Sequence, residues 1–138
     1  MSLIVDASVA VRWYLPEPGA KEAERVLLSE MPLLAPELII AEIGNAIWKR
    51  VRRGEVSERD AVDIVGRAMT AFTRLTPLSE LAVSAMALAA KLDHPVYDCF
   101  YLALAARENA PLITADKKVH GLRDRAGVAV DLLAMTRT

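Results

Sequence analysis

Short apolar runs alternate with longer segments of helical character along this chain, and this alternation limits the folds that it can adopt. The runs expected to form strands are residues 3–5, 33–35, 74–76, 112–114 and 128–130. Strands this short and this apolar, each followed by a helix, are typical of a parallel sheet that helices cover on both faces. The sequence therefore predicts an α/β fold, and its 138 residues favour a single domain, residues 1–138.

The helices are placed by their start and stop signals. Pro36 is expected at the first position of a long helix, where its missing N–H costs nothing. Ser57 followed by Asp60 resembles a capping box, with Asp in place of the usual Glu. The expected helices are residues 7–15, 20–29, 36–52, 57–72, 79–92, 96–108 and 117–122.

The net charge of the chain does not indicate a nucleic-acid-binding protein. Formal net charge is −1, from 17 basic and 18 acidic residues, whereas such proteins are often strongly basic. Any attraction to nucleic acid must come from local patches, such as KRVRRG at residues 49–54. Lys117, Lys118 and Arg12 are further candidates to engage phosphates, although basic residues near helix ends are often simply solvated.

Cysteine content and hydropathy bear on compartment and partners. The single cysteine, Cys99, excludes an internal disulfide framework and favours a reducing cytoplasm. Neither a signal peptide nor a run of 18 apolar residues is evident, so no membrane association is expected. Hydrophobic residues make up 54% of the chain, which is rich for a soluble protein. Part of this surplus is expected to face a partner rather than the core.

Four carboxylates stand in or beside these apolar runs: Asp6, Glu42, Asp98 and Asp116. Each has an ordinary explanation. Asp6 and Asp116 can cap the helices that follow them, with Ser8 competing for the first cap. Asp98 can interact with the dipole of its helix.

Glu42 has the weakest ordinary explanation, because it lies in mid-helix between Ile40 and Ile43. Helical periodicity places Ile40, Ile43, Ile47 and Val51 on one apolar stripe, and Leu38, Glu42, Asn45 and Lys49 on the adjacent one. That second stripe could be a solvated surface, which Lys49 would suit.

Taken together, the four acids point to a metal. Asp6 and Asp116 both follow strands, and ligand sites of parallel sheets form at the carboxyl ends of strands. Buried carboxylates must be paired, protonated or bound to a cation. An oxygen-only ligand set suits Mg²⁺ or Mn²⁺. The two histidines, His94 and His120, and Cys99 are too scattered for a zinc site.

Four motifs in order carry a family resemblance: VDAS, PELIIAEIGNAIWK, YDCFYLALA and LITADKK. With them the chain resembles the PIN-domain family, and within it the VapC-type toxins of toxin–antitoxin pairs. The resemblance covers nearly the whole chain. It implies a three-layer fold with a five-stranded parallel sheet in the order 3-2-1-4-5, in which the first and fourth strands bring Asp6 beside Asp116.

The resemblance also implies an activity and partners. It implies that Asp6, Glu42, Asp98 and Asp116 hold Mg²⁺ and cleave RNA phosphodiester bonds with a metal-activated water. Ser8, Asn45 and Thr114 match polar positions that support such pockets. A homodimer and a cognate antitoxin are implied as well. The expected partner surfaces surround two apolar segments, Val11-Trp13-Tyr14 and Ile47-Trp48-Val51.

Two other functions are compatible with the acids. One is a non-catalytic binding module whose acidic pocket holds a partner's arginine. The other is a phosphoryl-transfer enzyme with Asp6 as covalent acceptor. Phosphatases of that type want a second Asp two residues after the first, where this chain has Ser8.

Overall fold

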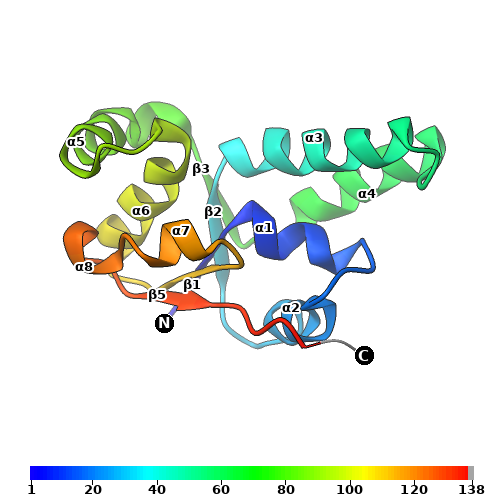
Figure 1. The fold of residues 1–138 in the computed structure, drawn as a ribbon, viewed down its shortest axis with the longest axis horizontal. Coiled ribbons are helices and arrows are strands. Elements are labelled where there is room, and N and C mark those ends of the chain that lie inside the picture. The colour runs from blue at the N-terminus through cyan, green and yellow to red at the C-terminus, as the bar shows by residue number, and fades with distance from the viewer. Residues whose placement is uncertain (137–138) are drawn as a thin grey trace.

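A five-stranded parallel sheet runs through the centre of the computed structural model, which describes residues 1–136 (Figure 1). The strands lie in the order β3-β2-β1-β4-β5, which confirms the predicted order. Their bounds are β1 Leu3–Val5, β2 Leu33–Pro36, β3 Arg74–Thr76, β4 Leu112–Thr114 and β5 Val130–Leu132. Ile4 of β1 is aligned with Leu34 on one side and Leu112 on the other. These aliphatic side chains are buried, as a sheet covered on both faces requires.

Helices flank the sheet on both sides (Figure 1). Helix α6 packs on β1, β2 and β4 and carries α5 against its outer side, whereas α1 packs on β4 and α3. The α3–α4 pair extends away from the sheet (Figure 1). The helices are α1 Ala7–Ala10, α2 Ala20–Leu27, α3 Leu38–Arg52, α4 Glu58–Thr70, α5 Ala82–Leu92, α6 Val96–Glu108, α7 Lys117–His120 and α8 Arg123–Ala126, with 3₁₀ turns η1 Val11–Trp13 and η2 Leu78–Glu80.

The placement of Pro36 was wrong. It is the last residue of β2 and pairs with Thr76 of β3, and α3 begins only at Leu38. The strand accepts this proline because β1 pairs with β2 only as far as Leu34, so the missing N–H of Pro36 breaks no ladder bond to β1. Ser57 does cap α4, since its hydroxyl accepts a hydrogen bond from the Asp60 N–H at 3.0 Å.

Other boundaries moved by a few residues. The helix expected over residues 7–15 is divided into α1 and η1, and the one expected over residues 79–92 into η2 and α5. A second short helix, α8, follows α7 and ends at Gly127, which has a φ of 68°. This left-handed glycine turns the chain, and the last strand therefore starts at Val130, two residues later than predicted.

The buried stripe of α3 consists of Ile39, Ile43 and Ile47, whereas Ile40 and Val51 are half-buried. The predicted stripe was thus rotated by part of a turn. Within residues 1–136, no helix combines the length and the apolar character that crossing a membrane requires.

Candidate active site

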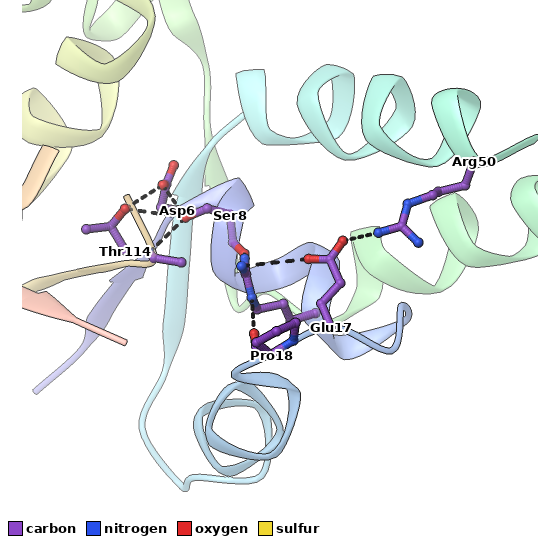
Figure 2. Close-up of polar contacts among 8 residues, drawn as sticks. Asp6, Ser8, Glu17, Pro18, Arg50 and Thr114 are labelled. Atoms are coloured by element: carbon purple, nitrogen blue, oxygen red, sulfur yellow. Dashed lines mark hydrogen bonds and ion pairs between the residues drawn. The ribbon is translucent and has the colours of Figure 1, made fainter. Parts of the chain in front are cut away.

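Asp6 follows β1 at the carboxyl end of the parallel strands, as the sequence predicted. Its side chain is buried, with 6% of its surface exposed. Its backbone has N-cap geometry, but its side chain does not cap α1. Instead Asp6 Oδ2 accepts hydrogen bonds from Ser8 Oγ at 2.6 Å and from Thr114 Oγ1 at 2.7 Å (Figure 2). The cap explanation of this carboxylate is therefore wrong.

The two hydroxyls are held in turn by the backbone. Ser8 Oγ accepts from the Ala115 N–H at 2.9 Å, and Thr114 Oγ1 accepts from the Asp116 N–H at 3.1 Å. Because a hydroxyl has only one proton, this arrangement leaves that proton to point at Asp6. Ser8 and Thr114 thus connect β1 to the end of β4 and fix the orientation of the carboxylate (Figure 2).

Glu42 lies on the half-buried side of α3, near its start. Its Oε1 accepts a hydrogen bond of 2.6 Å from the hydroxyl of Tyr101 on α6. Tyr101 is only 1% exposed. A solvated surface stripe does not describe Glu42, although its neighbours Asn45 and Lys49 are exposed. Sequence reasoning missed Tyr101, whose apolar surroundings gave no sign of a polar role.

Asp98 lies in the first turn of α6, where a carboxylate also benefits from the helix dipole. Its Oδ2 is 2.6 Å from Nε2 of His94, in the loop before the helix. His94 was not predicted to belong to the site. The i, i+4 spacing across Pro95 is the signal that could have found this pair.

Burial and mutual repulsion act on these acids. Burial is the main cause that raises the pKa of Asp6, and the negative charge of Asp98 adds to it, while the Ser8 and Thr114 hydrogen bonds oppose it. Burial also raises the pKa of Glu42, and the charges of Asp6 and Asp98 raise it further. Asp6, Glu42 and Asp98 therefore share one negative field.

Asp116 follows β4, beside the same edge of the sheet. Its Oδ1 accepts a hydrogen bond from the Lys118 N–H at 2.8 Å, so it caps α7. The cap explanation is thus confirmed for Asp116. Its backbone N–H also joins it to Thr114 and hence to Asp6.

The donor set suits a hard divalent cation. Residues 1–136 contain no three His, Cys, Asp or Glu side chains already gathered as ligands around one point. Yet Asp6 and Glu42 form no ion pair with any described basic side chain, and Asp98 pairs only with His94. Buried carboxylates such as Asp6 and Glu42, whose pKa is raised by burial and by neighbouring negative charge, are stabilised by an oxygen-seeking cation. The chemistry of these residues therefore fits Mg²⁺ or Mn²⁺.

The nearby arginines have structural partners. Arg12 donates to the carbonyl oxygens of Ser8 and Pro18, and lies 3.7 Å from Glu17. Glu17 also pairs with Arg50 of α3. Arg12, one of the residues suggested to engage phosphates, is therefore occupied in fastening α1 to the loop that follows it.

The raised pKa of Asp6 predicts how stability depends on pH. In the cation-free protein, ionised Asp6 destabilises the fold, so stability falls as pH rises from the ordinary Asp value through the raised folded value. We expect Asp6→Asn to unfold at higher urea concentration than the unmodified chain at pH 7. This gain in stability should vanish below about pH 4, where Asp6 is protonated and therefore as neutral as the asparagine that replaces it. Urea titrations at the two pH values measure the difference in stability between the two proteins. An Asp6→Asn variant that is less stable than the unmodified chain at pH 7 would contradict the prediction.

A parallel sheet in this order, with acidic residues following β1 and β4, defines a class of protein. The model of the PIN domain matches residues 3–125, and the chain belongs to this family. Similar curated proteins are VapC ribonucleases. Ribonuclease VapC3 from Pyrobaculum aerophilum is 35% identical over 86% of this chain and 92% of its own length. Ribonuclease VapC12 from Mycobacterium tuberculosis is 31% identical over 85% of this chain and 88% of its own length.

Solved structures show the same fold. The crystal structure of PAE2754 from Pyrobaculum aerophilum superposes with a TM-score of 0.68 and 24% identity, covering 96% of this chain and 84% of that one. FitAcB from Neisseria gonorrhoeae gives a TM-score of 0.57 at 16% identity, over 93% of this chain and 95% of that one. The predicted PIN-like architecture is therefore confirmed.

Proposed function

We propose that this chain is a metal-dependent endoribonuclease, the toxin of a toxin–antitoxin pair, acting in the cytoplasm. Relatives that are 30–35% identical along most of the chain are named ribonucleases. The observation that carries the proposal is Asp6, a buried carboxylate that two hydroxyls orient and that no basic side chain among residues 1–136 neutralises. A fold keeps such a costly group where a ligand compensates it.

The four acids would have two roles, binding the cation and orienting the attacking water. Asp6, Asp98 and Asp116 would contact it directly or through water, and Glu42 would orient the attacking water. When bound, Mg²⁺ or Mn²⁺ offsets the charge of the RNA phosphate and activates water for attack. Ser8 and Thr114 keep the Asp6 carboxylate in one orientation, and Tyr101 does the same for Glu42.

Cleavage of total RNA tests this function. We expect fragments with discrete ends when the protein is incubated with Mg²⁺, and none when a chelator removes the metal. Sequencing of the new ends measures both the activity and its target. Fragments that persist in chelator would contradict metal dependence, and intact RNA under all conditions would favour the non-catalytic binding module.

Tyr101 provides a sharper test of the site. Tyr101→Phe removes the donor to Glu42 Oε1 and keeps the ring in the core, so we expect cleavage to fall by about 10- to 100-fold, as for other residues that orient metal ligands. Tyr97→Phe is the matched control, because Tyr97 lies on the same helix and is exposed. Equal rates for the two variants would remove Tyr101 from the site.

The homodimer and the antitoxin are proposed as well, and Trp48 of the expected surfaces is 51% exposed. Val11 and Ile47 are buried in the core. Large exposed apolar side chains lie also on α4, on α5 and at the start of α6: Val62, Met69, Val83, Met86 and Tyr97. Exposed apolar side chains favour association where they form a patch. A monomer in light scattering at micromolar concentration would contradict the dimer.

A further inference from the structure

We infer that the outer end of α3 binds single-stranded RNA on one side of the cleaved bond. The surface consists of Trp48, Lys49, Arg52 and Arg53 and is called the α3 basic patch below. The inference rests on the proposed ribonuclease function and adds to it a place where the substrate is held. Four features of the patch carry it: its unpaired charge, its exposed tryptophan, its hollow and its position on the helix.

The charges of the patch are not neutralised by the protein. Lys49, Arg52 and Arg53 form no ion pair with any carboxylate among residues 1–136, whereas Arg50, on the same helix, pairs with both Glu17 and Glu55. In a chain of net charge −1, three such cations within five positions form a local positive field. Cations without protein partners are the side chains that remain available to phosphates.

Trp48 supplies a stacking surface inside this field. Its side chain is 51% exposed, so it is not part of the core. The Arg52 guanidinium lies 5.3 Å from the centre of its ring. Together with Lys49 and Arg53 these two residues line a hollow of about 360 Å³. An exposed aromatic ring among cations is the combination with which proteins hold unpaired bases and their phosphates.

The position of the patch connects it to the site. Lys49 and Arg53 follow Glu42 by seven and eleven residues, close to two and three full turns at 3.6 residues per turn, so all three lie on one face of α3. At 1.5 Å per residue, they lie about 10 and 16 Å from Glu42 along the axis. Figure 1 shows α3 running outward from the end of β2. A strand bound at the acids can therefore continue along this face to the patch.

RNA fits this surface better than a protein partner does. Phosphates complement the three cations, and a base can stack on Trp48. Other exposed apolar side chains, which favour protein association, lie on α4, α5 and α6. A protein partner bound at the patch would overturn the inference.

The test measures RNA binding in the Asp6→Asn background, with Mg²⁺ present, so that the RNA stays intact. Fluorescence anisotropy follows a labelled, mixed-sequence single-stranded RNA of about 12 nucleotides. The test variant is Lys49→Gln with Arg53→Gln. The matched control is Lys21→Gln with Arg25→Gln, which removes the same charge from exposed positions with the same i, i+4 spacing on α2. Titrations at salt concentrations between about 50 and 200 mM give the dependence on salt.

We expect the patch variant to bind RNA about tenfold more weakly and the control to bind within about twofold of the parent. Loss of two phosphate contacts should also reduce the slope of log K against log salt by about 1.4 for a single strand. Trp48→Ala should weaken binding at least about fivefold, whereas Trp48→Phe should retain most of it, because both rings can stack.

The inference is overturned if the patch and control variants lose equal affinity, if neither loses any, or if the parent does not bind RNA. It is also overturned if the patch variant binds RNA normally but no longer associates with itself or with an antitoxin. The proposed function fails separately: if RNA binds in a patch-dependent manner but the unmodified chain never cleaves it, the nuclease proposal falls and the patch stands.

Discussion

Asp6→Asn is expected to reduce RNA cleavage by more than about 100-fold without unfolding the chain. Changes to residues that merely orient a metal ligand commonly cost 10- to 100-fold, so loss of a ligand carboxylate should cost more. The fold should survive because the Asn side-chain oxygen can still accept hydrogen bonds from Ser8 and Thr114. Initial rates on a defined RNA at several Mg²⁺ concentrations measure the loss, and circular dichroism verifies the fold.

Asp131→Asn is the matched control for this experiment. Asp131 is exposed on β5, at the edge of the sheet, and its replacement removes the same charge without touching the site. We expect it to cleave at the rate of the unmodified chain. If Asp6→Asn retains activity at saturating Mg²⁺, Asp6 does not belong to the reacting centre.

Ile43→Ala is expected to lower the free energy of unfolding by about 2–5 kcal/mol, because it leaves a cavity in a packed core. Ile43 is fully buried on α3, next to Glu42. A loss of this size is a large part of the stability of a typical domain, about 5–15 kcal/mol. Urea denaturation followed by circular dichroism measures the effect.

Val62→Ala is the control for the core substitution. Val62 lies on α4 and its side chain is exposed, so its truncation should change stability by no more than about 0.5 kcal/mol. If Ile43→Ala lowers the free energy of unfolding as little as Val62→Ala does, the packing of the Ile43 side chain does not hold α3 in place.

The fold could be predicted because its signals are local. Three-residue apolar strands separated by helices specify a parallel sheet wherever they occur, and four of the five strands lie within a residue of their predicted bounds. The errors arose where tertiary contacts decide. Pro36 has the features of a helix start, and only the register of β1 against β2 shows that the strand can contain it. Gly127 adopts a positive φ that glycine permits but does not require, and β5 begins later for this reason.

The acids of the site could also be identified, but not their partners. Asp6 and Asp116 both stand before helices, and only the structure shows that Asp116 caps its helix while Asp6 turns to Ser8 and Thr114. Tyr101 is a core residue with 1% of its surface exposed. Its hydroxyl meets Glu42 across 59 positions of sequence, and no local pattern encodes that approach.

The exposed surface was the least predictable part. Trp48 was expected in the core or at an interface rather than on a surface where bases stack, and its 51% exposure excludes the core. Its exposure follows from its place on α3, one position beyond Ile47, which takes the buried side. A helical face can be inferred from spacing, but which face meets the core depends on how the helix is docked.

The bond between Thr114 and Asp6 joins residues that are 108 positions apart. A ribosome making this chain adds Thr114 108 residues after Asp6, so a shorter nascent polypeptide carries this carboxylate with Ser8 but without the second hydroxyl that orients it. The pocket therefore cannot be completed before residues 114–116, which follow β4, have joined the sheet beside β1.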